Sequence, residues 1–113
     1  MPLIHVRTNL SVPEGKRICL QHKMQRAIPL LRGKEESWLM FELTEECFLW
    51  FEGTDAPAAM VEVAVLGGLD AADCEALTER VSQEVSEVLQ IPMPRIYVRY
   101  SQAPYWGCGG KNL

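Results

Sequence analysis

The sequence lacks the long apolar run that a membrane span requires, since no stretch of about 18 apolar residues occurs in it. Its first residues also lack the charged and then apolar pattern of a secretory signal peptide. We therefore expect no membrane span and a cytoplasmic location, and release from the cell without a signal peptide stays open. The chain of 113 residues is too short for two separate cores, so we predict a single domain over residues 1–113.

The sequence has no Cys-x-x-Cys pair, and neither His5 nor His22 lies at metal-ligand spacing from a cysteine. The four cysteines are far apart along the chain, at Cys19, Cys47, Cys74 and Cys108. Zinc binding and thioredoxin-like chemistry are therefore unsupported. Free thiols in a reducing compartment are the simplest interpretation, and we predict no metal site.

Charge is neither abundant nor evenly distributed. Charged residues make up 23% and hydrophobic residues 48% of the chain, a composition typical of a folded protein rather than a disordered one. Residues 1–34 hold seven basic side chains against one acidic, whereas residues 35–90 hold fourteen acidic against one basic. No aromatic residue interleaves the basic charges of the first helix, and the acidic part would repel a polyanion, so we expect no nucleic-acid partner.

The first half of the chain is typical of a strand, a helix and a second strand. Residues 3–8 read as a strand, and residues 11–15 begin a helix with one apolar stripe. The stripe consists of Leu20, Met24, Ala27, Ile28 and Leu31. Because Pro29 lies inside it, we expect a kink or a tightened last turn before Gly33 ends the segment. Residues 38–43 then form a strand whose nearly continuous apolar character predicts burial on both faces.

The second half repeats this order about 57 residues later. Residues 60–66 are a valine-rich strand, Asp70 is the predicted N-cap of a helix, and residues 95–100 form the closing strand. We expect Pro92 to stop the helix. Its apolar stripe consists of Cys74, Leu77, Val81, Val85 and Val88.

Two such units, about residues 1–56 and 57–113, predict an α/β fold. Right-handed crossovers in a tandem β-α-β repeat give a four-stranded mixed sheet with both helices on one face. The other face then has no cover within the chain. We expect copies of the chain to bury it, because alternation points apolar residues to both sides of the second and third strands. Residues 47–51 are another apolar stretch, expected to be a short strand that docks on a neighbour's edge.

Several motifs, taken in order, resemble those of the tautomerase superfamily, specifically its macrophage migration inhibitory factor branch. They are Met1-Pro2, Thr8-Asn9, Val12-Pro13-Glu14-Gly15, Gly33-Lys34-Glu35-Glu36-Ser37-Trp38, Pro57-Ala58-Ala59, Arg95-Ile96-Tyr97-Val98 and Trp106-Gly107-Cys108-Gly109. The resemblance covers essentially the whole chain. It implies a symmetric homotrimer with active sites between subunits, no cofactor, and keto-enol tautomerisation of phenylpyruvate-like compounds. The expected small-molecule partner is thus a 2-keto acid or its enol.

Pro2 is the residue on which such chemistry depends. Removal of Met1 makes the secondary amine of Pro2 the α-amino group, which titrates nearer neutrality than a lysine and acts as a general base when neutral. Buried surroundings and nearby cations both lower its pKa, and we expect Lys34 and a neighbouring subunit's Arg99 to be these cations. They would also bind the substrate carboxylate and stabilise enolate charge. With Met1 retained, the Pro2 nitrogen is an amide and cannot be a base.

The resemblance implies further substrate-binding residues. They are Leu3, Leu66, Tyr97, Trp106, Cys108 and Leu113. Leu66 would offer its backbone N–H and Leu3 a pocket wall, and Tyr97 shares a strand face with Arg99 because residues two apart point to the same side. Structural explanations stay open for each, namely core packing for these apolar and aromatic residues, a helix C-terminus for Lys34, and an ion pair between subunits for Arg99.

The chain departs from the branch at several positions. Cys108 stands where an aromatic residue is common, and Arg99 and Leu113 stand where the best-known member has Asn and Phe. That member's Cys-x-x-Cys motif is replaced by Ala58-Ala59-Met60-Val61, so oxidoreductase activity is not expected. Two functions therefore compete. One is a cofactor-free tautomerase, and the other is a signalling or interaction protein of the same fold whose pocket is vestigial or only binds ligand.

Overall fold

A computed structural model describes residues 1–113 in full. The main elements are β1 (Pro2–Thr8), α1 (Glu14–Ala27), β2 (Met40–Thr44), β3 (Ala59–Leu66), α2 (Ala71–Leu89) and β4 (Ile96–Ala103). Two short strands, β5 (Gly107–Cys108) and β6 (Lys111–Asn112), form a hairpin near the C terminus. Three single 3₁₀ turns complete the chain, at Ile28–Leu30, Glu36–Trp38 and Met93–Arg95.

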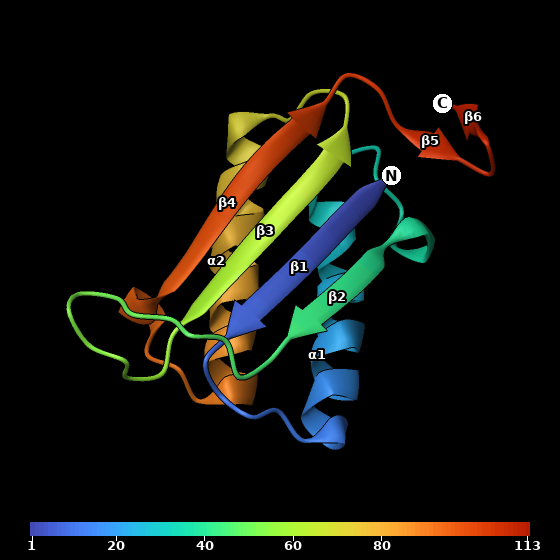
Figure 1. The fold of residues 1–113 in the computed structure, drawn as a ribbon. Coiled ribbons are helices and arrows are strands. Elements are labelled where there is room, and N and C mark those ends of the chain that lie inside the picture. Colours follow the sequence, from blue (N-terminus) through green and yellow to red (C-terminus); the bar gives the residue numbers. More distant parts are fainter.

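The four long strands form one sheet in the order β2-β1-β3-β4. Strand β1 is parallel to β2 and β3 is parallel to β4, whereas β1 and β3 run antiparallel at the centre. Figure 1 shows both helices on one face of the sheet and nothing over the other face. The predicted four-stranded mixed sheet with helices on one face is therefore confirmed. Neither helix is both long and apolar enough to cross a membrane.

The core lies between the sheet and the two helices. Every second residue of β1 and β3 is buried, because successive side chains of a strand point to opposite faces. From the helices and the turn after α1, the core includes Leu20, Met24, Ala27, Ile28, Leu31, Leu77, Val81 and Val85. Both halves of the chain thus share one core, and the opposite sheet face stays uncovered.

Both helices end through local backbone effects. Helix α1 passes into the 3₁₀ turn Ile28–Leu30, which is the tightened last turn that Pro29 predicts. Asp70 caps α2 as expected, since its side chain accepts two N–H groups of the first turn. Helix α2 ends where Gln90 adopts a left-handed conformation with φ of 57°, so Gln90 rather than Pro92 stops it.

The region around β2 differs from the prediction. Residues 36–38 form a 3₁₀ turn, so the strand begins at Met40 rather than at Trp38. Burial on both faces is wrong within the chain, because β2 is an edge strand and its residues alternate between half-buried and exposed. Met40 is 70% exposed. Apolar composition alone does not distinguish an edge strand from a central one.

Residues 47–51 do not form a strand within the chain, although the sequence predicted a short strand there. They lie in the loop 45–58, which crosses the end of the sheet opposite the N terminus (Figure 1). The loop's bridge between Phe51 and Thr54 is its one β-type pairing. Positive φ angles at Glu46 and Glu52 turn the backbone on either side of the segment. Docking on a neighbour's edge stays a prediction.

Candidate functional site

Four predicted site residues meet at the end of the sheet that holds the N terminus. Pro2 and Leu3 begin β1, and Leu66 ends β3, which pairs antiparallel with it. The Lys34 Nζ donates a hydrogen bond of 2.8 Å to the carbonyl oxygen of Leu66. The N–H of Leu66 in turn donates to the carbonyl oxygen of Met1 at 3.3 Å. An amine, an ammonium group and a backbone donor thus lie together at the start of β1.

The surroundings of this site favour a neutral amine. The pKa of the N-terminal amine, which in this chain belongs to Met1, is lowered from its ordinary value, first by loss of contact with water and second by the charge of Lys34. Pro2 itself is buried. Burial and the charge of Lys34, the two effects expected to lower the pKa of the Pro2 amine, therefore act on the Met1 amine, one residue away.

Local backbone geometry directs Lys34 into the site. Gly33 has φ of +81°, a left-handed conformation that suits glycine, and so it reverses the chain just before Lys34. The backbone N–H of Lys34 donates to Leu31 at 3.0 Å, and Leu31 is anchored in the core. An ammonium group has three donors, and the chain binds one of those of Lys34. The other two are available to a ligand.

A small pocket opens beside these groups. It has a volume of ≈ 200 Å³ and is lined by Met1, Gly33, Glu35 and Trp38. Neither Glu35 nor Trp38 belongs to the site residues predicted from the sequence. Both residues belong to the motif of residues 33–38 that contains Lys34, and this shared motif was the signal in the sequence that could have identified them. The strand predicted over residues 38–43 assigned Trp38 to the sheet instead.

Tyr97 and Arg99 lie elsewhere on the sheet. Both are exposed on the open face of β4, as their spacing predicts. In the register, Arg99 lies beside Glu62, whose carboxylate already pairs with Arg7, and Arg99 itself makes no ion pair or side-chain hydrogen bond within the chain. A single chain therefore does not bring Arg99 or Tyr97 to Pro2.

The larger pocket of the chain lies at the opposite end of the sheet. It has a volume of ≈ 230 Å³ and is lined by Leu49, Trp50, Phe51, Ala58, Ala59, Met60, Arg95 and Tyr97. The Tyr97 ring meets Phe51 edge-on, with centroids 4.8 Å apart. The guanidinium of Arg95 donates to four backbone carbonyls there. Because this pocket holds no candidate base and no free cation, we place the candidate active site at the smaller pocket.

The remaining predicted residues lie in the C-terminal hairpin region. Cys108 is in β5, and both it and Leu113 are exposed, whereas Trp106 is half-buried. Figure 1 shows the hairpin projecting from the body on the side of the N terminus. None of the three lines the pocket beside Met1.

Cysteine and metal-ligating side chains form no further cluster. All four cysteines are free thiols. No group of three or more His, Cys, Asp or Glu side chains is arranged to hold a metal ion.

Comparison with known proteins finds relatives over the whole chain. The profile of the family described as macrophage migration inhibitory factor (MIF) matches residues 1–112. The chain is similar to MIF2 of Leishmania major, with 27% identity and a TM-score of 0.95 over 100% of this chain and 97% of that one. It is also similar to the MIF homologue of Prochlorococcus marinus, with 28% identity and a TM-score of 0.88 over 97% of each chain.

A fused 4-OT described as an asymmetric trimer shares the fold, with 21% identity and a TM-score of 0.85 over 96% of this chain and 94% of that one. No curated sequence matches the chain.

Proposed function

Because the chain belongs to the macrophage migration inhibitory factor family, we propose that it is a cofactor-free keto-enol tautomerase of phenylpyruvate-like 2-keto acids. One observation carries the proposal. An amine whose pKa is lowered, the Lys34 ammonium and the Leu66 N–H converge at the start of β1. After loss of Met1, this set would supply a base, a carboxylate-binding cation and a hydrogen-bond donor at one end of the sheet, beside the pocket lined by Gly33, Glu35 and Trp38.

The reaction requires removal of Met1. The secondary amine of Pro2 then becomes the terminal amine, and in its neutral form it accepts a proton from the carbon next to the keto group. The negative charge moves to the keto oxygen, which the protonated amine then protonates to give the enol. Lys34 binds the carboxylate of the acid. Loss of Met1 also removes the carbonyl that Leu66 binds, which frees the Leu66 N–H for the substrate.

We propose that a neighbouring copy completes the site within a homotrimer. Large apolar side chains stay exposed in the single chain, including Trp38, Met40, Phe48, Trp50, Tyr97 and Leu113. A surface of this kind favours burial against another copy. Arg99 keeps all five of its guanidinium donors unused, and it would reach a neighbour's carboxylate-binding pocket from the open sheet face. Light scattering at micromolar concentration should give the mass of three chains, and a stable monomer would contradict this assembly.

The experiment that tests the enzyme is an intact-mass measurement and an assay of phenylpyruvate tautomerisation on one sample. We expect activity in chains that have lost Met1 and none in chains that retain it. Processed Pro2→Gly should lose about 10²- to 10⁴-fold in rate while keeping its fold, because a primary amine replaces the positioned secondary one. An unchanged rate would remove Pro2 from the mechanism. A processed, trimeric wild-type chain without activity would favour the signalling or interaction protein instead.

A further inference from the structure

Arg32 lies two residues before Lys34 and contacts the first turn of α2. Its backbone N–H donates to Oδ2 of Asp73 at 3.2 Å, and its Nε lies 3.1 Å from both oxygens of the same carboxylate. Its Nη2 lies 3.2 Å from Oδ2 of Asp70. The hydrogen bond from Arg32 is also the main reason that the pKa of the Asp73 carboxyl lies below its ordinary value.

Helix α2 does not depend on this contact. The second oxygen of Asp70, Oδ1, accepts the N–H groups of Ala72 and Asp73 and caps the helix by itself. Acidic side chains in a first turn are favourable with or without a partner, because they face the positive end of the helix dipole. Arg32, in contrast, belongs to a stretch without helix or strand. The contact therefore orders the stretch of Arg32 more than it orders the helix.

Arg32 and Lys34 hold the same connection, the one between β3 and α2. Lys34 binds the carbonyl oxygen of Leu66 where the connection begins, and Arg32 binds the first turn of α2 where it ends. Gly33, with φ of +81°, separates the two. The connection is itself tied to β4 by two hydrogen bonds of 3.0 Å, from Gly67 N to Ala103 O and from Leu69 N to Gln102 Oε1.

We propose that Arg32 is a positioning residue for Lys34. Held by Asp70 and Asp73, it fixes the main chain from which the Lys34 ammonium reaches the start of β1. The proposal rests on the function proposed above, in which Lys34 binds the substrate carboxylate. Without the contact, the Lys34 side chain occupies more positions, so it binds the carboxylate less well and acts less strongly on the terminal amine.

The test compares Arg32→Met and Asp73→Asn, each alone and combined with Lys34→Met, in the processed full-length protein. For phenylpyruvate, each single variant should raise KM by about 2- to 5-fold, because the contact of Arg32 is exposed to solvent, and should change kcat less. The methyl ester should be affected less, because it carries no carboxylate for Lys34. In the Lys34→Met background, Arg32→Met should add nothing to KM. Arg32→Lys, which keeps the charge, should recover part of the loss.

A second readout does not require catalysis. Titration of the Pro2 nitrogen by NMR should give a higher midpoint in Arg32→Met than in the wild type, because a mobile Lys34 lowers the pKa of the amine less. Lys34→Met sets the upper limit of that change.

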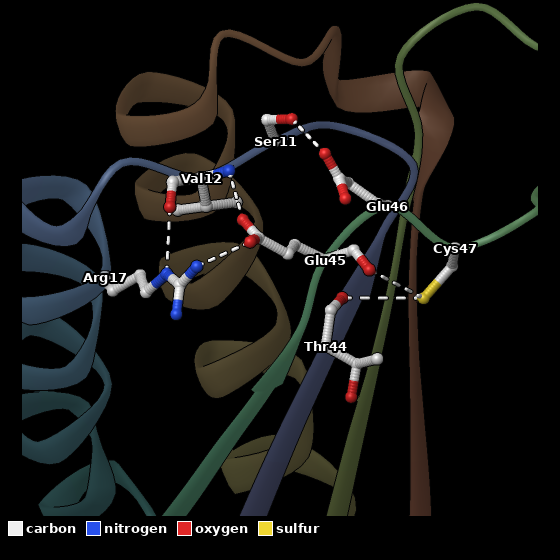
Figure 2. Close-up of polar contacts among 7 residues, drawn as sticks. All are labelled: Ser11, Val12, Arg17, Thr44, Glu45, Glu46 and Cys47. Atoms are coloured by element: carbon white, nitrogen blue, oxygen red, sulfur yellow. Dashed lines mark hydrogen bonds and ion pairs between the residues drawn. The ribbon is translucent and has the colours of Figure 1, made fainter.

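The matched control is Arg17→Gln at the opposite end of the sheet. There, Arg17 contacts the carboxylate of Glu45 at 2.5 Å and the carbonyl oxygen of Val12 at 2.8 Å, as Figure 2 shows. The control should lower thermal stability without changing KM or the amine midpoint. A purely structural role for Arg32 would give the same result as the control.

The outcomes separate the two proposals. If Arg32→Met adds its full effect to that of Lys34→Met, the positioning role is overturned and the proposed function stands. If the wild type does not convert phenylpyruvate, the proposed function fails, and the amine titration alone decides the role of Arg32. If the midpoint of the Pro2 amine is unchanged in Arg32→Met but raised in Lys34→Met, the positioning role of Arg32 is overturned. Asp73→Asn supplies the same measurements if Arg32→Met does not fold.

Discussion

The two ends of the sheet use similar charged side chains in different ways. At the end opposite the N terminus, the chain itself supplies at least two partners to each of two cations. Arg17 binds Glu45 and a backbone carbonyl (Figure 2), and Arg95 binds four carbonyls, those of Phe51, Thr54, Ala56 and Pro57. At the N-terminal end, Lys34 binds a single carbonyl and lies beside an amine whose pKa is lowered.

The number of partners that a cation has within the chain distinguishes a cation that holds a loop from one that is available to a ligand, and it does so better than pocket size. The larger pocket, at ≈ 230 Å³, lies at the end where Arg95 binds four carbonyls, and the smaller, at ≈ 200 Å³, lies beside the Met1 amine and Lys34. A donor that already binds the backbone holds a loop in place. A donor that the fold leaves free is available to a ligand, because binding there breaks no existing hydrogen bond.

Replacing Lys34 should have the largest effect, because it removes the cation that distinguishes the N-terminal end of the sheet from the opposite end. In processed Lys34→Met, loss of a charge-assisted contact should cost about 1.5 to 3 kcal/mol, or roughly 10- to 150-fold in kcat/KM for phenylpyruvate. The charge of Lys34 lowers the pKa of the Met1 amine, and we expect the same effect on the Pro2 amine once Met1 is lost, so removal of that charge should raise the pKa of the Pro2 amine and leave less neutral base at pH 7. The rising limb of the pH–rate profile should therefore move to higher pH.

The control for this variant is the methyl ester of phenylpyruvate, whose KM should change less. A pH–rate profile with an unmoved rising limb would show that Lys34 does not act on the base.

Arg99→Ala should have the next largest effect, and it tests whether the open sheet face belongs to a neighbour's site. If Arg99 binds the carboxylate bidentately, KM for the acid should rise roughly tenfold, for a loss of about 1.5 kcal/mol, with the trimer intact. A role in an ion pair between subunits predicts dissociation of the trimer instead. Steady-state kinetics on the acid and its ester, together with light scattering, distinguish the two. Equal losses for acid and ester in an intact trimer would exclude carboxylate binding.

Arg95→Met should show the smallest effect and should reduce stability rather than substrate binding. Four hydrogen bonds to carbonyls of the loop 45–58 are lost, but these carbonyls are near solvent and regain water. We expect a loss of about 1 kcal/mol, measured by denaturant unfolding against the wild type. A tenfold rise in KM with unchanged unfolding would show instead that this end of the sheet takes part in binding.

The order and type of the elements could be read from the sequence because short-range physics sets them. Valine-rich alternation gives β3, the stripe from Leu20 to Leu31 gives α1 and its last turn, and Asp70 gives the start of α2. The meeting of Pro2, Lys34 and Leu66 could be predicted only through resemblance to a family. No local pattern says that residues so distant along the chain are neighbours.

The errors arose where distant contacts decide. The same apolar composition that makes a buried strand elsewhere lies at an open edge in β2 and in an irregular loop at residues 47–51. A strand at the edge of a sheet and a strand at its centre have different neighbours, and the order in which the strands pair decides which position a strand takes.

The sequence by itself determined the two β-α-β units, the apolar stripes of their helices and the glycine that turns the chain before Lys34, because periodicity, capping and positive φ depend on residues close together. Only the tertiary structure decided which cations are free. Arg32, Arg95 and Lys34 are all basic residues near turns, but the first binds the carboxylates of α2, the second binds four carbonyls, and the third binds one. Whether a charge stabilises the fold or stays available to a substrate depends on the acceptors that folding brings within about 3 Å of it.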